Sequence, residues 1–223
     1  MLAMFDKNAT PVPLRQAGGG LHVKPILASA SPQRTAILTQ LGINHLVVPA
    51  HVEERSDGDP EQVAETNARA KAQSVAATHP FVPVIGSDTI VVTDAGRILG
   101  KPADLAEARA MLTTLVGTSH TVISGLAIVG PGPNASRSGV AKTTVRMRPL
   151  DAEAIDRHLL HGEWEGRAGG YAIQGRGGGL VESIEGDYLN VVGLPVSLLA
   201  KLAPDLLDRA PRKRTAAVER SAE

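Results

Sequence analysis

Short apolar runs alternate with amphipathic stretches over the first half of the chain, a pattern typical of an α/β fold. We expect strands at four apolar runs, which are residues 26–28, 45–49, 82–92 and 97–99. The amphipathic stretches predict three helices, at residues 32–41, 60–77 and 105–115. Ser31 precedes the first helix, while Asp59 and Asp104 begin capping boxes at the other two. Polar capping residues therefore define where each helix begins.

Longer β-type runs dominate the second half of the chain. The pattern predicts three strands at residues 120–129, 140–148 and 180–185, a hairpin loop at residues 130–139, and helices at residues 151–160 and 195–202. The glycine-rich segment 166–179 is followed by a strand pattern and not by a helix, which excludes a dinucleotide-binding fingerprint. Close approach of the backbone to a ligand, or tight packing, explains the glycines of this segment better than a dinucleotide-binding loop does.

The distribution of proline, glycine and charge divides the chain into three parts. Residues 1–24 show little periodicity, so we expect a flexible N-terminal extension there. Residues 25–203 form the predicted folded domain, and residues 204–223 are a charged C-terminal tail. A chain of 223 residues suits one large α/β domain or two small ones, and no linker forces two independent units.

Composition narrows the classes of function. Aromatic residues make up only 2% of the chain, so its core must be aliphatic. Cysteine is absent, which excludes disulfides, thiolate metal sites and thiol catalysis. Lys plus Arg and Asp plus Glu both number 23, so the chain has no net charge that would favour binding to nucleic acid or to a membrane. No apolar run reaches transmembrane length, and residues 1–24 lack a signal-peptide h-region, so the expected compartment is the cytoplasm.

The first candidate for chemistry is the strand-to-helix turn in the sequence ILASASPQRTAIL. Ser29 and Ser31 offer hydroxyl groups, Pro32 begins the helix, and Arg34 adds a cation close to the helix N-terminus. Free backbone N–H groups and a positive charge at such a turn predict an anion site, with phosphate as the expected anion. An ordinary capped helix is the alternative.

A second candidate is the acid within the apolar run VPVIGSDTIVV. Asp88 would be desolvated there unless it is paired or bound to metal, so it suits a general base or a Mg²⁺ ligand. An acid exposed at a strand end is the alternative. Lys101 follows a turn and could face Asp88 across the hairpin, or be a solvated lysine. Glu53 and Glu54 point oppositely in an extended segment, so at most one shares a site with Asp88.

Three polar residues of the second half are further candidates for a site. Gln174 lies in the glycine-rich segment, and its amide can read a nucleobase edge because it both donates and accepts. His158 and His161 are three residues apart on a predicted helix, but no third metal ligand lies nearby in the sequence. We therefore interpret both histidines as surface residues.

Five motifs together carry a resemblance to a known family. LASASPQR, GSDTIVV, LGKP, AGGYAIQGRGG and EGDYLNVVGLP occur in this order between about Pro25 and Leu202, and the chain resembles the Maf family of nucleoside triphosphate pyrophosphatases. The resemblance implies a Maf/Ham1-like α/β fold, in which an elongated mixed sheet flanked by helices forms two lobes around a nucleotide cleft. It also implies Mg²⁺-dependent cleavage between the α and β phosphates, giving the monophosphate and pyrophosphate, and a homodimer.

The resemblance also implies roles for individual residues. Asp88 falls on the catalytic carboxylate of the family and on its metal site, which Glu54 would share. The positions that match phosphate-binding residues of the family are Ser29, Ser31, Arg34, Lys71 and Lys101.

Base preference is expected to depend on Gln33, Thr89 and Gln174. The family branch acting on 7-methyl-GTP tends to carry an aromatic residue, Gln and Glu at these three positions. Thr89 and Gln174 instead match the branch acting on dTTP and UTP, whereas Gln33 departs from both branches, since the pyrimidine branch usually has Arg there.

We therefore predict an enzyme that hydrolyses dTTP, UTP and modified pyrimidine analogues with Mg²⁺ or another divalent cation. One alternative is a 7-methyl-GTP pyrophosphatase. The other is a nucleotide-binding regulator of septum formation or cell division with incidental catalysis. The intact Asp88 together with three cations, Arg34, Lys71 and Lys101, favours an enzyme.

Overall fold

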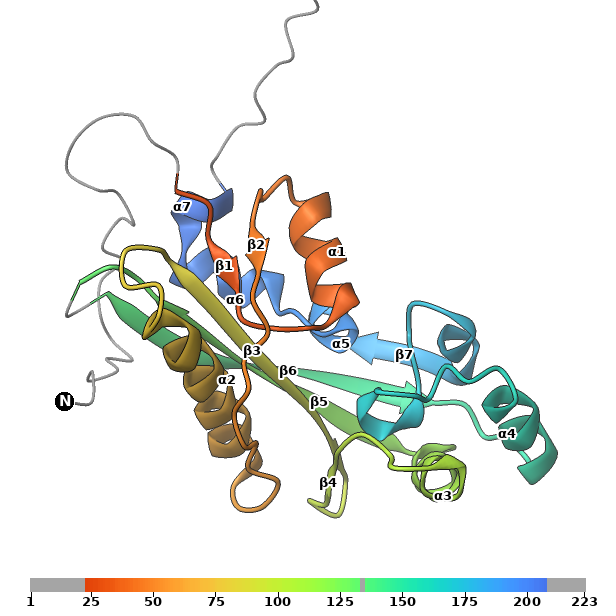
Figure 1. Ribbon diagram of the computed structural model, residues 1–223. Coiled ribbons are helices and arrows are strands. Elements are labelled where there is room, and N and C mark those ends of the chain that lie inside the picture. Colours follow the sequence, from red (N-terminus) through yellow and green to blue (C-terminus); the bar gives the residue numbers. More distant parts are fainter. Residues whose placement is uncertain (1–22, 133–134, 208–223) are drawn as a thin grey trace, which may run out of the picture.

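The computed structural model describes residues 23–132 and 135–207 of the chain. The expected N-terminal extension, apart from its last two residues, lies outside this range, as do residues 208–223 of the expected tail. Within the described residues, seven strands form one mixed sheet in the order β2-β1-β3-β5-β6-β7, with β4 paired to β3 (Figure 1). The predicted α/β fold with a mixed sheet flanked by helices is confirmed.

The elements follow one another as the sequence pattern indicates. The strands are β1 (Ile26–Leu27), β2 (Leu46–Val47), β3 (Val84–Thr93), β4 (Ile98–Leu99), β5 (Ser119–Val129), β6 (Ser136–Met147) and β7 (Val181–Glu185). The α-helices are α1 (Pro32–Gln40), α2 (Pro60–Ala76), α3 (Leu105–Leu115), α4 (Ala152–Leu159), α5 (Tyr188–Val192), α6 (Val196–Leu202) and α7 (Pro204–Leu207). Two 3₁₀ turns, η1 (Ala168–Gly170) and η2 (Arg176–Leu180), lie in the glycine-rich segment.

The predicted helix caps are present. The side chains of Ser31, Asp59 and Asp104 each accept a hydrogen bond from the backbone N–H three residues further on. These caps satisfy donors that the first helical turn leaves unpaired, which is why the three helices begin where the sequence predicts.

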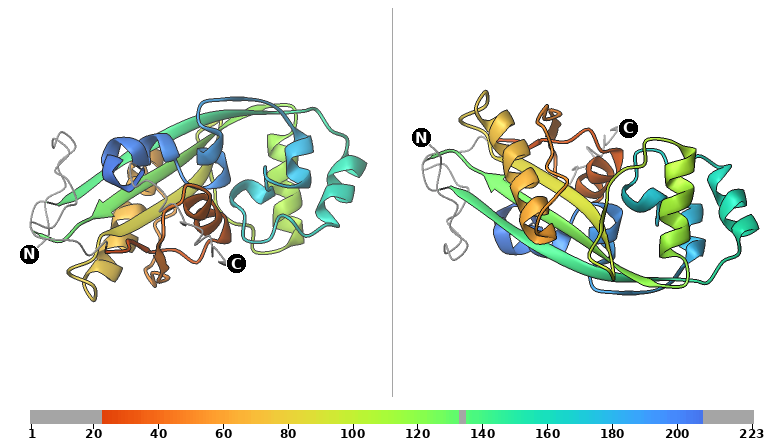
Figure 2. Two further views of the ribbon diagram at one scale, coloured as in Figure 1. Left: turned by 90° about the horizontal axis from the view of Figure 1, so that it is seen from above. Right: turned by 90° about the horizontal axis from the view of Figure 1, so that it is seen from below.

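Two lobes share the long strands of the sheet. Figure 2 shows β5 and β6 running along the molecule, with α1, α2 and α6 towards one end and α3 and α4 at the other. One aliphatic core lies beneath α3 and α4 and includes Leu112 and Val145, whereas another lies beneath α1 and α6 and includes Ile37 and Leu199. The predicted division into two lobes is therefore confirmed.

Helix α2 packs unusually close to the sheet. A Cβ atom at Gly86 of β3 would overlap the carbonyl oxygen of Ala68, and one at Gly125 of β5 would overlap that of Ala64. Ala72 completes the small-residue face of the helix and is fully buried. Because glycine faces alanine along this contact, short polar side chains of α2 can reach the sheet.

The pairing of β3 leaves part of one edge open. Strand β1 pairs with Val84 and Ile85, and β4 pairs with Val91 and Val92. Among the described residues, no strand covers this edge of β3 between the two pairings. Asp88 lies in the uncovered part, so the predicted site forms where the sheet is interrupted.

Three features differ from the sequence prediction. Strand β6 begins at Ser136 and not near residue 140, because the buried polar residues Ser136–Ser138 pair with β5 although their composition is typical of a loop. Helix α5 was not predicted. Helix α7 falls at the start of the expected tail, yet its Leu206 is buried in the core, so the folded part continues at least to Leu207.

His158 corrects a prediction. It was interpreted as a surface residue, but only 6% of it is exposed. It lies on the same face of α4 as Ile155 and Leu159, which are also buried, because residues three or four apart share one face of a helix. His161 is exposed, as expected.

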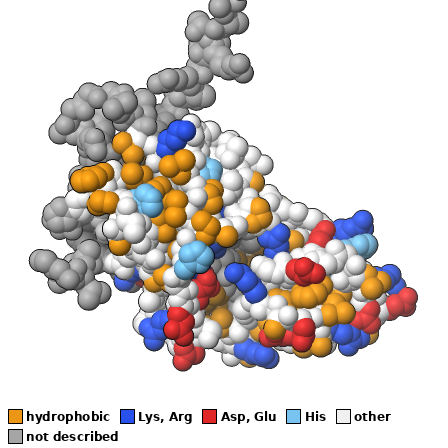
Figure 3. Space-filling model, in the orientation of Figure 1, with side chains coloured by type: hydrophobic (Ala, Val, Ile, Leu, Met, Phe, Trp, Pro, Cys, Tyr) orange, Lys and Arg blue, Asp and Glu red, His pale blue; other side chains and the backbone are white. Residues whose placement is uncertain are grey.

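The surface carries exposed apolar side chains around the edge strand β2. Leu46 and Val47 of β2 are about half exposed, and Figure 3 shows hydrophobic side chains gathered over this part of the face. In the part of the chain that the structure describes, every helix is too short or too polar to cross a bilayer.

Candidate active site

A cleft of about 660 Å³ lies between the two lobes. Its walls come from the β1–α1 turn, the segment before α2, the middle of β3, the glycine-rich segment and the end of α5. All ten predicted site residues line this cleft, namely Ser29, Ser31, Gln33, Arg34, Glu54, Lys71, Asp88, Thr89, Lys101 and Gln174. The structure thus brings together residues that are up to 145 positions apart in the sequence.

Basic side chains outnumber acidic side chains in the cleft, although the whole chain has no net charge. The basic residues are Arg34, Arg55, Lys71, Lys101 and Arg167, and the acidic residues are Glu54, Asp88 and Glu165. A local excess of positive charge with carboxylates at one side suits a polyanion that carries a divalent cation.

The turn between β1 and α1 is held by its own side chains. Ser31 Oγ accepts a hydrogen bond from the Arg34 backbone N–H at 3.4 Å and donates one to Gln33 Oε1 at 3.2 Å. Ser29 Oγ accepts from the Ser31 backbone N–H at 3.2 Å and from Arg34 Nη1 at 2.9 Å. The hydroxyl groups and the guanidinium therefore lie close together at the turn.

Arg34 is fixed at all three of its nitrogen atoms. Besides its bond to Ser29, Nε donates to the carbonyl of Gly193 at 2.8 Å and Nη2 donates to Thr89 Oγ1 at 3.2 Å. Burial lowers the pKa of Arg34, while the charges of Asp88 and Glu54 act in the opposite direction. Thr89 thus orients Arg34, and its hydroxyl also bonds to Ser124 Oγ at 2.8 Å.

Asp88 lies within β3 and only 4% of it is exposed, which rules out an acid exposed at a strand end. Its Oδ1 accepts a hydrogen bond from Lys71 Nζ at 2.6 Å. The same Nζ lies 2.8 Å from Glu54 Oε1. Lys71 is itself buried. Its ammonium group contacts both Asp88 and Glu54, the two acids that the family resemblance assigns to one metal site.

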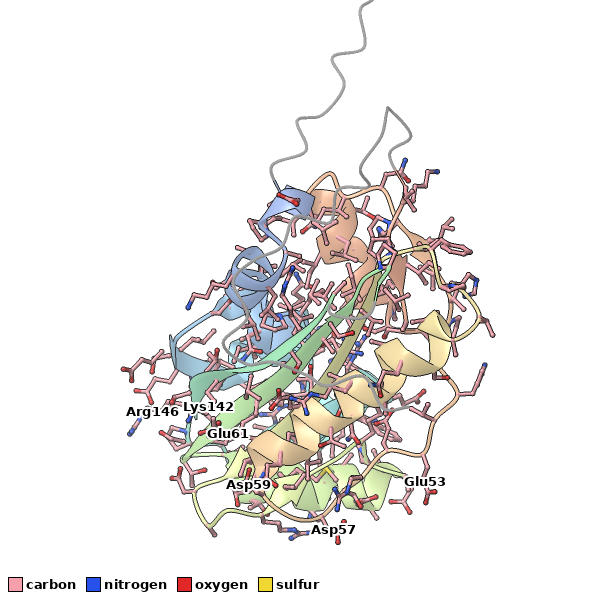
Figure 4. The ribbon with its side chains drawn as sticks, turned by 90° about the vertical axis from the view of Figure 1, so that its left-hand side faces the viewer. Glu53, Asp57, Asp59, Glu61, Lys142 and Arg146 are labelled. Atoms are coloured by element: carbon pink, nitrogen blue, oxygen red, sulfur yellow. The ribbon has the colours of Figure 1, made fainter. Side chains whose placement is uncertain are left out.

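Of the two adjacent glutamates, Glu54 is the one that reaches the site. Its carboxylate contacts Lys71, whereas Glu53 is not among the residues lining the cleft. Figure 4 shows Glu53 on the segment before α2. It lies apart from the pair formed by Lys142 and Glu61, which is on the other side of that helix. Of the two glutamates, only Glu54 therefore lies in the cleft with Asp88.

The arrangement of acids can be compared with what a divalent cation needs. Mg²⁺ is commonly held by one or two carboxylates, with the remaining positions filled by phosphate oxygens and water. Glu54 and Asp88 both contact one Nζ, so their oxygens converge on one small region at the cleft wall. No group of three or more acids or histidines suited to a metal occurs among the described residues. Two carboxylates fit a cation that is shared with a phosphate ligand.

Asn67 is a site residue that the sequence analysis missed. It lies on α2, one turn before Lys71, and its Nδ2 donates to Asp88 Oδ2 at 2.9 Å. An asparagine in a helix that is rich in polar residues has no signal in a single sequence. The short distance between α2 and β3 alone brings it to the carboxylate.

Lys101 and Gln174 differ from the residues above because both are exposed. Neither side chain forms a hydrogen bond or ion pair with another residue of the described chain. Lys101 lines the same cleft as Asp88 without contacting it. Both side chains therefore remain available to a ligand.

The turn that carries Gln174 is anchored by Glu163, a second residue that the sequence analysis missed. The Glu163 carboxylate accepts hydrogen bonds from the backbone N–H groups of Arg176 at 3.1 Å and Gly177 at 3.2 Å. The bond from Arg176 is the main cause of a lowered pKa of Glu163. A Cβ atom at Gly177 would overlap the Ala172 carbonyl, so tight packing explains this glycine.

Tyr171 forms part of the cleft wall on the same side as Gln174. Its hydroxyl lies 2.8 Å from Nε2 of the fully buried His120, and the two rings meet edge to face at 5.6 Å. Burial raises the pKa of Tyr171 and lowers the pKa of His120 to about 4. At neutral pH both groups are therefore uncharged.

The chain is similar in sequence to proteins of a known family. A family model described as Maf-like protein matches residues 24–206. A dTTP/UTP pyrophosphatase of Pelotomaculum thermopropionicum is 42% identical over 179 residues, which cover 79% of this chain and 93% of that protein. A protein of the same name from Thermococcus gammatolerans is 45% identical over 177 residues, covering 79% and 94%.

Similarity to solved structures is weaker. The Ham1 protein of Staphylococcus aureus aligns with 55% of this chain and 71% of that chain, at 13% sequence identity and a TM-score of 0.41. A likeness at this level carries no further conclusion.

Proposed function

The chain belongs to the Maf-like protein family, and we propose that it hydrolyses dTTP, UTP and modified pyrimidine nucleoside triphosphates to the monophosphate and pyrophosphate. One observation carries this proposal above all. A single cleft joins the buried Asp88 to basic side chains from five different segments of the chain. Such a cleft can hold a triphosphate and place a carboxylate where it can act on a water molecule beside the phosphates.

Three of the basic residues would bind the triphosphate, each in a different way. Arg34 is held rigidly by three hydrogen bonds, so it would bind phosphate at a fixed position and at little entropic cost. Lys101 is exposed and would close on the phosphates as a flexible point charge. Lys71 has three N–H donors, of which two are engaged with Asp88 and Glu54, so one remains for a phosphate oxygen.

Glu54 and Asp88 would hold the divalent cation, for which we propose Mg²⁺. When bound, the cation polarises the phosphate oxygens and neutralises charge that develops during cleavage. Asp88 would also orient the attacking water and accept its proton, because it is the acid buried at the cleft wall. Lys71 and Asn67 hold its two carboxylate oxygens, so its orientation is set before the substrate binds.

Gln174 would select the base. Its amide can donate to O4 and accept from N3–H of uracil or thymine, whereas cytosine presents the reverse pattern. Glu163 and the tight packing of Gly177 fix the turn that carries Gln174. A fixed amide discriminates well because a mismatched base leaves polar groups unpaired. We propose Thr89 as a second selecting residue acting through Arg34, and Gln33 as a third at the same turn.

The alternatives are less well supported. The compared relatives are named for dTTP and UTP and not for 7-methyl-GTP. A regulator with incidental catalysis would not need a buried carboxylate held by both a lysine and an asparagine.

The proposed compartment is the cytoplasm, where the nucleotide substrates occur. The homodimer implied by the family resemblance stays a prediction that light scattering of the purified chain can test.

Pyrophosphate release with Mg²⁺ tests the function. We expect dTTP and UTP to be cleaved faster than dCTP, 7-methyl-GTP and the common purine triphosphates. Gln174→Glu should reduce the preference for dTTP over dCTP, because a carboxylate cannot donate to O4. Gln40→Glu makes the same chemical change at an exposed position at the end of α1 and should leave the preference unchanged.

Two results would count against the proposal. Absence of pyrophosphate release from every triphosphate would reject the enzyme. Equal efficiency of the unmodified protein towards dTTP and 7-methyl-GTP would show that Gln174 and Thr89 do not select the base.

A further inference from the structure

Asn67 makes three hydrogen bonds from one buried amide. Its Nδ2 donates to Asp88 Oδ2 and also to the backbone carbonyl of Arg55, both at 2.9 Å. Its Oδ1 accepts from the backbone N–H of Arg55, again at 2.9 Å. Only 2% of the residue is exposed, so water cannot replace these partners without a local opening.

The pair of bonds to Arg55 resembles the pairing of one strand with another. One amide satisfies both the N–H and the C=O of a single residue in a segment without regular structure. Arg55 immediately follows Glu54, so fixing its backbone also restricts the position of the Glu54 carboxylate. The Glu54 side chain is 44% exposed, and its ion pair with Lys71 alone would hold it weakly.

The third bond ties the same amide to the other acid. Lys71 occupies Oδ1 of Asp88 and Asn67 occupies Oδ2, so the carboxylate is held at both oxygens. Asn67 reaches it because Gly86 and Gly125 let α2 approach the backbone of the sheet. The two carboxylates therefore share a support on α2, although they belong to different segments of the chain.

We propose that Asn67 is a positioning residue that couples the Glu54 segment to Asp88, so that both carboxylates are aligned before cation and substrate bind. This inference rests on the proposed function, because it assigns Asn67 to the reaction of the same cleft. Its structural part, the coupling of Arg55 to α2, can be measured without any catalysis.

Two substitutions separate the two tasks of the amide. Asn67→Leu has a similar size and removes all three hydrogen bonds. Asn67→Asp has the same shape and keeps an acceptor for the Arg55 N–H, but loses both donors and places a carboxylate against Asp88. Gln73→Ala, a partly exposed position further along α2, is the matched control for a change in this helix.

Hydrogen exchange of the Arg55 backbone amide reports the coupling directly. In Asn67→Leu this amide should exchange about 3–10-fold faster than in the unmodified chain, the equivalent of one lost hydrogen bond. In Asn67→Asp it should remain protected, because the acceptor is still present. Gln73→Ala should exchange as the unmodified chain does.

Steady-state kinetics measure how the loss of Asn67 affects the function of Glu54 and Asp88. Both Asn67 variants should lower kcat by about 10–100-fold, as expected for a group that orients cation-binding carboxylates. The preference for dTTP over dCTP should not change, because Asn67 supports the acids and not the turn of Gln174. A purely structural role would instead reduce activity only in proportion to the unfolded fraction, which a thermal melt measures.

The outcomes distinguish this inference from the proposed function. If the unmodified chain releases no pyrophosphate, the function fails while exchange at Arg55 still decides the coupling. Unchanged exchange in Asn67→Leu would overturn the coupling, and normal kcat in a folded Asn67→Asp would overturn the role towards Asp88. If Asn67→Leu does not fold, Asn67→Asp carries the kinetic test and Asn67→Ala, which also lacks the acceptor, carries the exchange test, where unchanged exchange at Arg55 would equally overturn the coupling.

Discussion

The buried pair of His120 and Tyr171 makes the stability of the protein depend on pH. His120 is fully buried on β5, and its Nε2 bonds to the Tyr171 hydroxyl, while Nδ1 has no hydrogen-bond partner among the described residues. Desolvation lowers the pKa of His120 from 6.5 to about 4, and the opposing effect of the Asp94 charge is smaller. The native state therefore holds this histidine neutral well below the pH at which it protonates in the unfolded chain.

The direction of the effect follows from proton binding. Between pH 6.5 and about 4 the unfolded chain binds a proton that the native state does not, so acid stabilises the unfolded chain. The whole interval is worth about 3 kcal/mol of unfolding free energy, and about 2 kcal/mol of it is lost by pH 5. This contribution is present in full above pH 6.5 and falls as the pH is lowered.

Urea unfolding at pH 7.5 and pH 5.0 measures the loss, with the fluorescence of Trp164, the only tryptophan, as the signal. His120→Gln keeps a neutral group that can bond to Tyr171 and should remove about 2 kcal/mol of the difference between the two pH values. His158 is also buried with a pKa lowered mainly by desolvation, so only the comparison with His120→Gln isolates His120. His161→Gln, at an exposed position, is the control.

One result would refute this reasoning. If His120→Gln lost as much stability on acidification as the unmodified chain, His120 would not be held neutral in the native state. The loss would then belong to other groups.

Two further predictions concern the cleft. Asp88→Asn has the same shape and should fold, yet lower pyrophosphate release by about 10²–10⁴-fold, the usual contribution of a positioned base; near-normal turnover would remove Asp88 from the mechanism. Lys101→Ala should raise the Michaelis constant for dTTP or lower turnover, with little change in melting temperature because the side chain is exposed. Lys24→Ala removes an exposed lysine outside the cleft and is the control, and a sharp loss of stability with unchanged kinetics would make Lys101 structural.

Local signals in the sequence were sufficient to place most elements. The caps at Ser31, Asp59 and Asp104 were predicted because each bond joins residues only three apart. The strands were predicted from apolar runs for the same reason, since burial of a strand is visible in its own residues. The resemblance to a family then identified ten residues that the structure brings into one cleft.

Features that depend on distant partners could not be predicted in this way. Ser136–Ser138 look like a loop until β5 pairs with them, and His158 looks like a surface residue until α4 packs. Leu206 was assigned to the tail because only the core shows that it is buried. In each case the contact that decides burial or pairing joins two distant segments, and neither sequence indicates that it will contact the other.

The order of the elements and the chemistry available to the cleft follow from the amino-acid sequence alone. Tertiary structure decided how the acids are held. Asn67 supports Asp88 only because glycine and alanine face one another where α2 crosses the sheet, which brings a short amide within 2.9 Å of a carboxylate 21 residues away. A hydrogen bond across that distance depends on backbone packing, and packing is a property of two elements together and not of either sequence alone.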